Sequence, residues 1–173
     1  AAQVKVAERA DDFRLVDHKS KTQLLSYYKN SPAVVIISQQ NGAKAIRDAA
    51  AEIKALQASF ASKEVPLLLL NSNPADNRDT IAAEMASLGL DVPVLLDDTQ
   101  LVGEGLGVSR VAQAIVIQPK TWKVVYSGPI SAGSKTYVAD AVNSLVAGTP
   151  VKVSMAEIKT PLIAFPNRDR KAE

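Results

Sequence analysis

Apolar runs and helical stripes follow one another along this chain of 173 residues. The longest apolar runs are AVVII, which begins at Ala33, and VPLLLL, which begins at Val65. Continuous runs of this kind are typical of strands that are covered on both faces. Both are far shorter than the roughly 20 residues that cross a bilayer as a helix. We therefore expect buried strands over residues 33–38, 65–70 and 92–96.

Helical periodicity is clearest over residues 43–60, where apolar side chains recur at three- and four-residue spacing. They form a single stripe made of Ile46, Ala49, Ala50, Ile53, Leu56 and Phe60. A second helix is expected to begin at a cap on Asp76 or Asn77 and to end at Leu88. These two helices follow the first two buried strands, as in a strand–helix–strand unit.

The remaining expected elements are shorter. They are strands over 4–7 and 13–17, a helix capped by Thr22 that runs to Tyr28, a helix over 100–106, a hairpin of strands over 114–118 and 122–126, and a last helix over 137–146. The residues after 148 show no strong period and contain Pro161 and Pro166, which is typical of an extended arm.

This order of elements predicts an α/β fold. Alternating strands and helices build a parallel sheet, and the terminal hairpin adds an antiparallel edge. We expect a three-layer α/β/α sandwich over residues 1–148 and an extended C-terminal arm over residues 149–173. The arm could lie across its own domain or reach into a groove on a partner, and the sequence leaves both open.

Composition narrows the function. The chain has 20 basic and 18 acidic residues, well interspersed, which argues against a nucleic-acid surface. It has no cysteine, and this removes disulfides, thiolate metal sites and thiol redox chemistry. The start at Ala1, without Met, fits an exported protein whose signal peptide has been removed, so we expect a periplasmic or similar location.

Several segments resemble the redoxin proteins related to the peroxiredoxins (the AhpC/TSA type), which have a thioredoxin-like fold. DDFRLVDHKSKT is similar to their entry pattern pdFrLlDhxGk, and AVVIISQQNGAKAIRDAAAEI to their strand, active-site loop and first long helix, where the loop pattern is GCPixRkxapEi. VAQAIVIQPKTWKVVYSGPI is similar to TPexfviDpxxxkivYxGxi, and LLLLNSNPADNRDTIAAEMASLGLDVPVLLDDTQLVGEGLGVSR to their middle section. The resemblance covers residues 10–130 and implies their fold.

The departures from these patterns bear on activity. Ala43 stands where the family has its reactive Cys, and Lys44 where it has Pro. Val111 and Ala112 stand at the family's Thr and cis-Pro. A thiol at this helix start would have a lowered pKa and react as a thiolate, whereas Ala offers only a methyl group. We therefore expect no redox catalysis here, and a trans bond before Ala112, because a non-proline cis bond costs about 2.5–4 kcal/mol.

Other chemical motifs are weak. The stretch GEGLG, from Gly103, does not follow a strand, so it lacks the context of a phosphate loop. His18 is the only histidine and lies in a turn, where we expect a structural role. Asp97 and Asp98 precede a helix and are expected to be caps rather than a catalytic pair. A metal or cofactor carrier would need ligands that one histidine and two methionines do not supply, so no cofactor or metal is expected.

The candidate sites are therefore contact surfaces. In the former active-site loop we expect Asn41 to cap the helix, although an anion or a peptide could also bind there. The residues proposed for partner binding are Gln39, Gln40, Asn41, Gly42, Lys44, Arg110, Val111, Ala112, Leu162, Ile163 and Phe165.

The function expected from these observations is that of a non-catalytic accessory or scaffold subunit in a complex with other proteins. Size and export suggest one concrete form, the small subunit of an exported, membrane-associated, quinoprotein-type dehydrogenase complex. The alternative is an enzyme or ligand-binding protein that uses the former active-site loop without a thiol.

Overall fold

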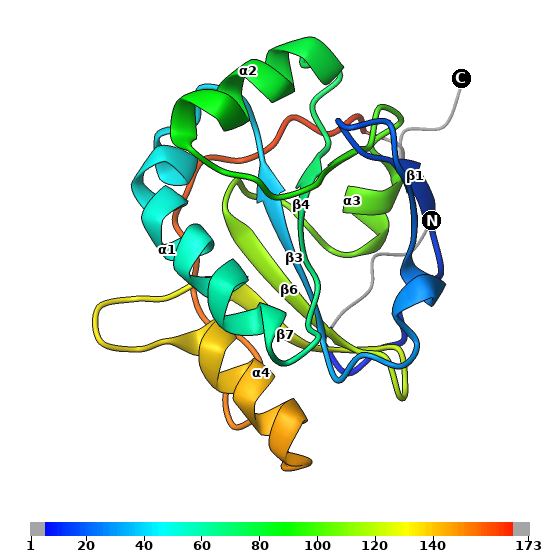
Figure 1. Cartoon of the computed structure of the whole chain (residues 1–173), viewed down its shortest axis with the longest axis vertical. Helices are drawn as coiled ribbons and strands as arrows, with labels where there is room; N and C mark the ends of the chain where they lie inside the picture. The colour runs from blue at the N-terminus through cyan, green and yellow to red at the C-terminus, as the bar shows by residue number, and fades with distance from the viewer. Residues whose placement is uncertain (1–5, 168–173) are drawn as a thin grey trace.

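A mixed sheet of five strands forms the centre of the molecule, whose computed structural model describes residues 6–167. The strand order is β5-β4-β3-β6-β7, with bounds Val34–Gln39 (β3), Leu67–Asn71 (β4), Val94–Leu96 (β5), Gln113–Gln118 (β6) and Lys123–Pro129 (β7). Strands β3, β4 and β5 are parallel, whereas β6 and β7 form an antiparallel hairpin beside β3. The mixed sheet with its antiparallel edge is as predicted (Figure 1).

Four α-helices surround this sheet. They are Lys44–Ala61 (α1), Arg78–Leu88 (α2), Leu101–Gly105 (α3) and Tyr137–Ala147 (α4). Helix α1 packs against β4, and α4 packs against β6 and β7. None of the helices in residues 6–167 is long and apolar enough to span a bilayer.

The predicted apolar runs and stripe form the core. In β3, the side chains of Val34 to Ile37 are fully buried, as expected for a central strand. Along α1, Ile46, Ile53 and Phe60 are buried, and the other members of the stripe are partly buried against them. The stripe therefore faces the sheet, as predicted.

The second helix begins at Asn77, one of the two predicted caps. The Asn77 side chain accepts a hydrogen bond from the backbone N–H of Thr80, and the Thr80 hydroxyl accepts one from the N–H of Asn77. This reciprocal pair satisfies two N–H groups that the helix itself leaves unpaired. The helix ends before Gly89, whose left-handed backbone (φ +66°) closes the last turn.

Two expectations near the N-terminus are wrong. Residues 4–7 were expected to form a strand; residues 4 and 5 lie outside the described part, and residues 6 and 7 form a turn. Thr22 does not cap a helix, because Thr22–Leu24 is a strand (β2) that pairs antiparallel with Arg14–Val16 (β1). Only Leu25–Tyr28 is helical, as one 3₁₀ turn (η1). Pairing with β1 thus outweighs the local capping signal of Thr22.

The outer edge of β7 is paired with two segments, one near the N-terminus and one in the C-terminal arm. Near the N-terminus, Ala7 donates to Val124 and Ala10 donates to Trp122 through backbone hydrogen bonds of 2.8 and 2.7 Å. Further along the edge, the backbone N–H of Ser127 donates to the carbonyl of Ser154 in the arm at 3.0 Å. An edge strand that is paired in this way offers no open ladder for another chain.

The arm docks on its own domain, with contacts as far as Phe165. Figure 1 shows it as the orange-to-red trace that runs from the end of α4 to the opposite end of the molecule. It passes so close to β7 that a Cβ on Gly128 would lie 2.9 Å from the carbonyl oxygen of Ala156. Of the two placements that the sequence left open, the described part of the arm takes the one in cis.

Candidate functional site

The junction between β3 and α1 holds the loop where the resemblance places a reactive residue. Ala43 is the N-cap of α1 and makes no side-chain capping bond. The prediction that Asn41 caps this helix is wrong. Gly42, with φ +75°, turns the chain between Asn41 and the helix, so Asn41 stands too early to cap it. The Asn41 side chain instead accepts a hydrogen bond of 2.9 Å from the side-chain amide of Gln39.

The backbone N–H groups of this loop are occupied by carboxylates. The N–H of Asn41 donates to Asp76 Oδ2 at 3.0 Å, and the N–H of Gly42 donates to Glu84 Oε2 at 2.7 Å. The Gly42 carbonyl accepts from the guanidinium of Arg47 at 2.8 Å. Charged partners make hydrogen bonds roughly twice as strong as neutral ones. An anion that used the N–H groups of Asn41 and Gly42 would have to displace these two carboxylates.

A buried amide network supports the loop from below. Asn71, at the end of β4, donates from its side-chain nitrogen to Gln39 Oε1 and to Asp76 Oδ2, at 2.9 Å each. Asp76 also accepts from the side chain of Asn73 at 3.1 Å. Gln39 and Asn71 are 0% and 3% exposed. Gln39, one of the residues proposed for partner binding, is thus part of the interior.

The second predicted segment, residues 110–112, lies beside the end of β3. Its backbone is held by buried Ser38, whose carbonyl accepts from the N–H of Ala112 at 2.9 Å and whose hydroxyl donates to the carbonyl of Arg110 at 2.5 Å. All peptide bonds within the described residues are trans, including the one before Ala112. Ala112 has φ +58°, in the left-handed region that residues with a Cβ rarely adopt.

The arm pairs with this segment through a single antiparallel bridge between Arg110 and Leu162. The N–H of Val111 donates to the carbonyl of Pro161 at 3.0 Å, and the N–H of Ile163 donates to the carbonyl of Ser109 at 2.9 Å. Ile163 is 6% exposed, whereas Leu162, which bridges to Arg110, is 65% exposed. The pairing therefore buries one of the two apolar side chains and leaves the other facing outward.

Side chains strengthen the same contact. The hydroxyl of Thr160 donates to the carbonyl of Val111 at 2.5 Å, and the guanidinium of Arg110 donates to the carbonyl of Thr160 at 2.5 Å. Further along the arm, Phe165 packs against α3, where a Cβ on Gly103 would lie 3.2 Å from its ring. The arm is thus fixed on both sides of the exposed Leu162 side chain.

A cavity of about 440 Å³ opens where the loop, α1 and the arm meet. Its lining residues are Gln40, Gly42, Ala43, Lys44, Ala45, Asp48, Val111 and Pro161. The ammonium of Lys44 pairs with Asp48 at 2.6 Å, so the one cation of the lining has a carboxylate beside it. The structure therefore brings the loop residues, Val111 and the arm to one place, and puts Phe165 against α3.

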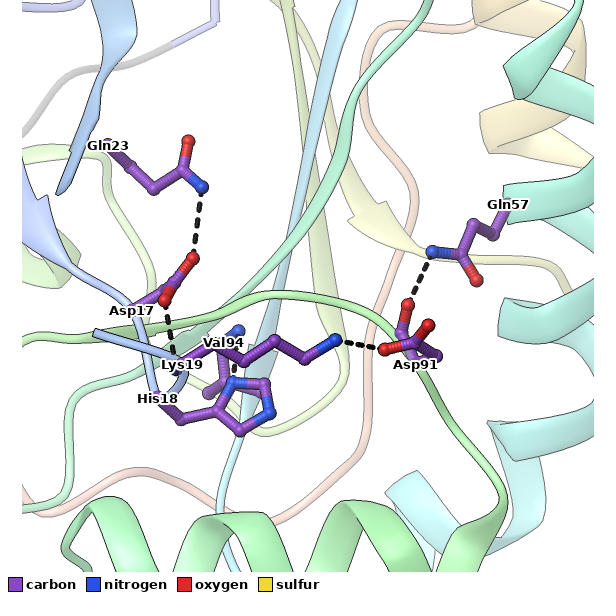
Figure 2. Close-up of polar contacts among 7 residues, drawn as sticks. All are labelled: Asp17, His18, Lys19, Gln23, Gln57, Asp91 and Val94. Carbon is purple, nitrogen blue, oxygen red and sulfur yellow. Dashed lines mark hydrogen bonds and ion pairs between the residues drawn. The ribbon is translucent and has the colours of Figure 1, made fainter. Parts of the chain in front are cut away.

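The side chain of His18 is buried, in a turn near the N-terminus, and it has a structural role in this fold (Figure 2). Its Nδ1 accepts a hydrogen bond of 3.1 Å from the backbone N–H of Val94, which requires an imidazole that carries no proton on Nδ1. Burial lowers the pKa of His18 below its usual value of 6.5, and the neighbouring Asp17 opposes this. Lys19 forms an ion pair with Asp91 close by.

The other motifs considered in the sequence, Asp97 and the GEGLG stretch, lie in or next to α3. Asp97 is fully buried, and its carboxylate accepts from the N–H of Gly103 at 2.8 Å and of Val102 at 3.2 Å. It thus binds N–H groups in the first turn of α3, although the N-cap is Gln100 and neither of the two predicted aspartates. The GEGLG stretch lies in α3 and its exit, after the helix has begun, and not in the loop between β5 and α3. Within residues 6–167, no three histidine, aspartate or glutamate side chains gather in a way that could hold a metal ion.

The comparisons with known proteins agree with this geometry. The sequence profile of the AhpC/TSA family matches residues 6–132. A search among curated protein sequences finds no match. A solved structure of a hypothetical protein from Sinorhizobium meliloti is similar with a TM-score of 0.84 and 19% identity, over 95% of this chain and 97% of that one.

Two further structures show the range of the likeness. An uncharacterized conserved protein from Geobacillus kaustophilus is similar with a TM-score of 0.79 and 21% identity, over 90% of this chain and 89% of that one. The peroxidoxin BcpB from Mycobacterium tuberculosis has a TM-score of 0.65 and 20% identity, over 84% and 98%. At such identities the likeness shows the fold alone. The predicted thioredoxin-like α/β fold is confirmed.

Proposed function

This chain belongs to the AhpC/TSA family, and we propose that it is a non-catalytic member that acts by binding other protein subunits. The observation that carries the proposal is the state of the β3–α1 loop. Ala43 stands at the start of α1 in a chain without cysteine, and two N–H groups of the loop already bind the carboxylates of Asp76 and Glu84. Such a loop has no thiol nucleophile, and two of its N–H groups are not free to bind an oxyanion.

The arm supports the contact role. It holds Leu162 outward between fixed neighbours, and Met155 and Val153 are 67% and 45% exposed along the same arm. When a partner binds apolar side chains on an already ordered backbone, little further conformational entropy of the backbone is lost. Among the residues proposed for partner binding, Leu162 is the one whose exposure best fits direct contact.

The finer form of the proposal rests on the sequence alone. It is the small accessory subunit of an exported, membrane-associated dehydrogenase complex of the quinoprotein type. In such a complex another subunit would carry the catalytic centre, so this chain would need no reactive residue of its own.

Purification from the native cells tests the contact role. A tagged copy, cross-linked in the cells, is expected to bring down the same partner proteins reproducibly, as identified by mass spectrometry. Leu162→Glu should reduce their yield at least fivefold, because it places a charge in an apolar contact. The matched control is Tyr27→Glu, at a side chain that is 62% exposed on η1, and it should leave the yield unchanged. Recovery of the wild type only as a free monomer would refute the proposal.

A ligand-binding role is the second candidate, and the cavity of about 440 Å³ beside Ala43 is the observation that favours it. Its size lies within the range of small-molecule sites, about 300–1,000 Å³. Native mass spectrometry of the protein from its own cells would show a bound molecule. In this case Ala43→Phe, which fills the cavity, should abolish the added mass.

A further inference from the structure

A second cavity lies under the arm, on the side of the domain formed by β6, β7 and the end of α3. Its volume is about 550 Å³, and it is separate from the residues of the β3–α1 loop. The arm bridges it between two anchors. One is the hydrogen bond from Ser127 to Ser154, and the other is the pairing of Ser109 with Ile163. Residues 155, 156 and 158 of the arm form the outer wall between these anchors.

The wall of this cavity is mainly apolar. Leu106 and Val124 line it from the domain, and both are at most 4% exposed. Met155 and Ile158 line it from the arm, and Met155 is 67% exposed at the rim. A flexible methionine at a cavity mouth can adapt to the shape of an apolar guest. An apolar guest would remove the exposed surface of Met155 from water, which favours binding.

The polar part of the lining is small and contains no charge. Gln113 is 5% exposed and uses all its capacity internally: its oxygen accepts from the N–H groups of Ser109 and Arg110, and its nitrogen donates to Gly107 and to the hydroxyl of Ser127. Because the Ser127 hydroxyl accepts from Gln113 and donates to no residue in the described part, its proton is available to a ligand.

We propose that the cavity under the arm binds a small uncharged molecule that has a largely apolar body and one hydrogen-bond acceptor. The apolar body would lie between Leu106, Val124 and Ile158, and its acceptor would receive the proton of Ser127. A charged ligand is disfavoured, because none of the eleven lining residues carries a charge to compensate it. The proposal is independent of the contact role described above.

Prodan, an uncharged naphthyl ketone whose emission shifts to the blue in apolar surroundings, is a suitable probe. Titration of the whole chain should give saturable, blue-shifted emission. Anilinonaphthalene sulfonate, which has a similar aromatic body and a negative charge, should bind at least tenfold more weakly. Equal binding of both dyes, or no saturable binding of Prodan, would overturn the proposal.

A matched pair of variants locates the site. Ala156→Phe fills the cavity under the arm and should weaken Prodan binding at least tenfold. Ala43→Phe fills the other cavity with the same side chain and should leave the binding within twofold of the wild type. Equal affinities in the two variants would place the dye elsewhere and refute the proposal.

The wild-type chain gives a test that needs no substitution. It has two methionines: Met155 at the rim of the cavity, and Met85 in the core at 2% exposure. In a sample with ¹³C-labelled methionine methyl groups, Prodan should shift the signal of Met155 and leave that of Met85 in place. A shift of neither signal would contradict the proposed site, and so would a shift of both.

Discussion

Ala112 adopts a backbone conformation that is costly for any residue with a Cβ. Its φ of +58° lies in the left-handed region, which costs roughly 1–2 kcal/mol. The cost is offset locally, because the N–H of Ala112 donates to Ser38 and the neighbouring Val111 pairs with the arm. The structure therefore holds this segment in a form that a proline could not adopt.

Replacement of Ala112 tests this conformation. Ala112→Pro should lower the free energy of unfolding by about 3 kcal/mol or more, since proline requires a φ near −65° and has no N–H for Ser38. Ala112→Gly is the control and should change it by less than about 1 kcal/mol, because glycine accepts positive φ. Urea denaturation measures both. A proline variant as stable as the glycine variant would show that the segment is not fixed in this form.

His18 is expected to make stability depend on pH. Its pKa in the folded chain lies below the unfolded value of 6.5, so the unfolded chain binds the proton more readily. Stability should be complete above about pH 6.5 and fall as the pH drops towards the folded pKa, because a proton on Nδ1 removes the acceptor for the N–H of Val94. Asp17, Lys19 and Asp91 are the charged groups around the ring.

A variant isolates this effect. His18→Asn keeps an acceptor for the N–H of Val94, through its side-chain oxygen, and does not titrate. Its urea midpoint should stay constant between pH 7.5 and 5.5, whereas that of the wild type should fall. The same fall in both proteins would assign the pH dependence to other groups.

At the scale of elements, Ile163 is the one buried side chain among residues 149–167 of the arm. Ile163→Ala should weaken the docking of the arm by about 2 kcal/mol, at the low end for a buried Ile. Leu162→Ala, at the exposed neighbour, should change it by less than about 0.5 kcal/mol. Because the N–H of Val111 bonds to Pro161, hydrogen exchange in a peptide that covers Val111 reports on docking. The exchange rate should rise roughly 30-fold in Ile163→Ala and not in Leu162→Ala. Equal exchange rates in the two variants would contradict this role of Ile163.

The sequence pattern predicted those elements that depend on residues close together in the chain. The stripe of α1 and the cap on Asn77 depend on residues a few positions apart, and both are confirmed. The strand at Thr22 depends on pairing with β1, and no pattern within residues 22–28 marks it. The hydrogen bonds of the candidate site also depend on residues that are distant in the sequence. Asp76 and Glu84 reach the loop from 35 and 42 residues away, and the local pattern predicted Asp76 only as a possible helix cap.

At the scale of the whole molecule, the two terminal segments pair with backbone edges that the domain would otherwise leave open. The strand edge of β7 is paired by both ends, and the segment at residues 109–111 is paired by the arm. Within residues 6–167, six large hydrophobic side chains stay exposed, and three of them, Val153, Met155 and Leu162, lie on the arm. Export, membership of a dehydrogenase complex and the identity of the partners stay predictions.

The most direct test of the central claim is a measurement of turnover by the pure chain. Hydrogen peroxide consumption with a dithiol reductant, and reduction of insulin disulfides, should both proceed at the rate of the protein-free buffer. Saturable turnover that rises with protein concentration would show that the AhpC/TSA domain catalyses redox chemistry without a cysteine, and it would contradict the proposed role as a binding subunit.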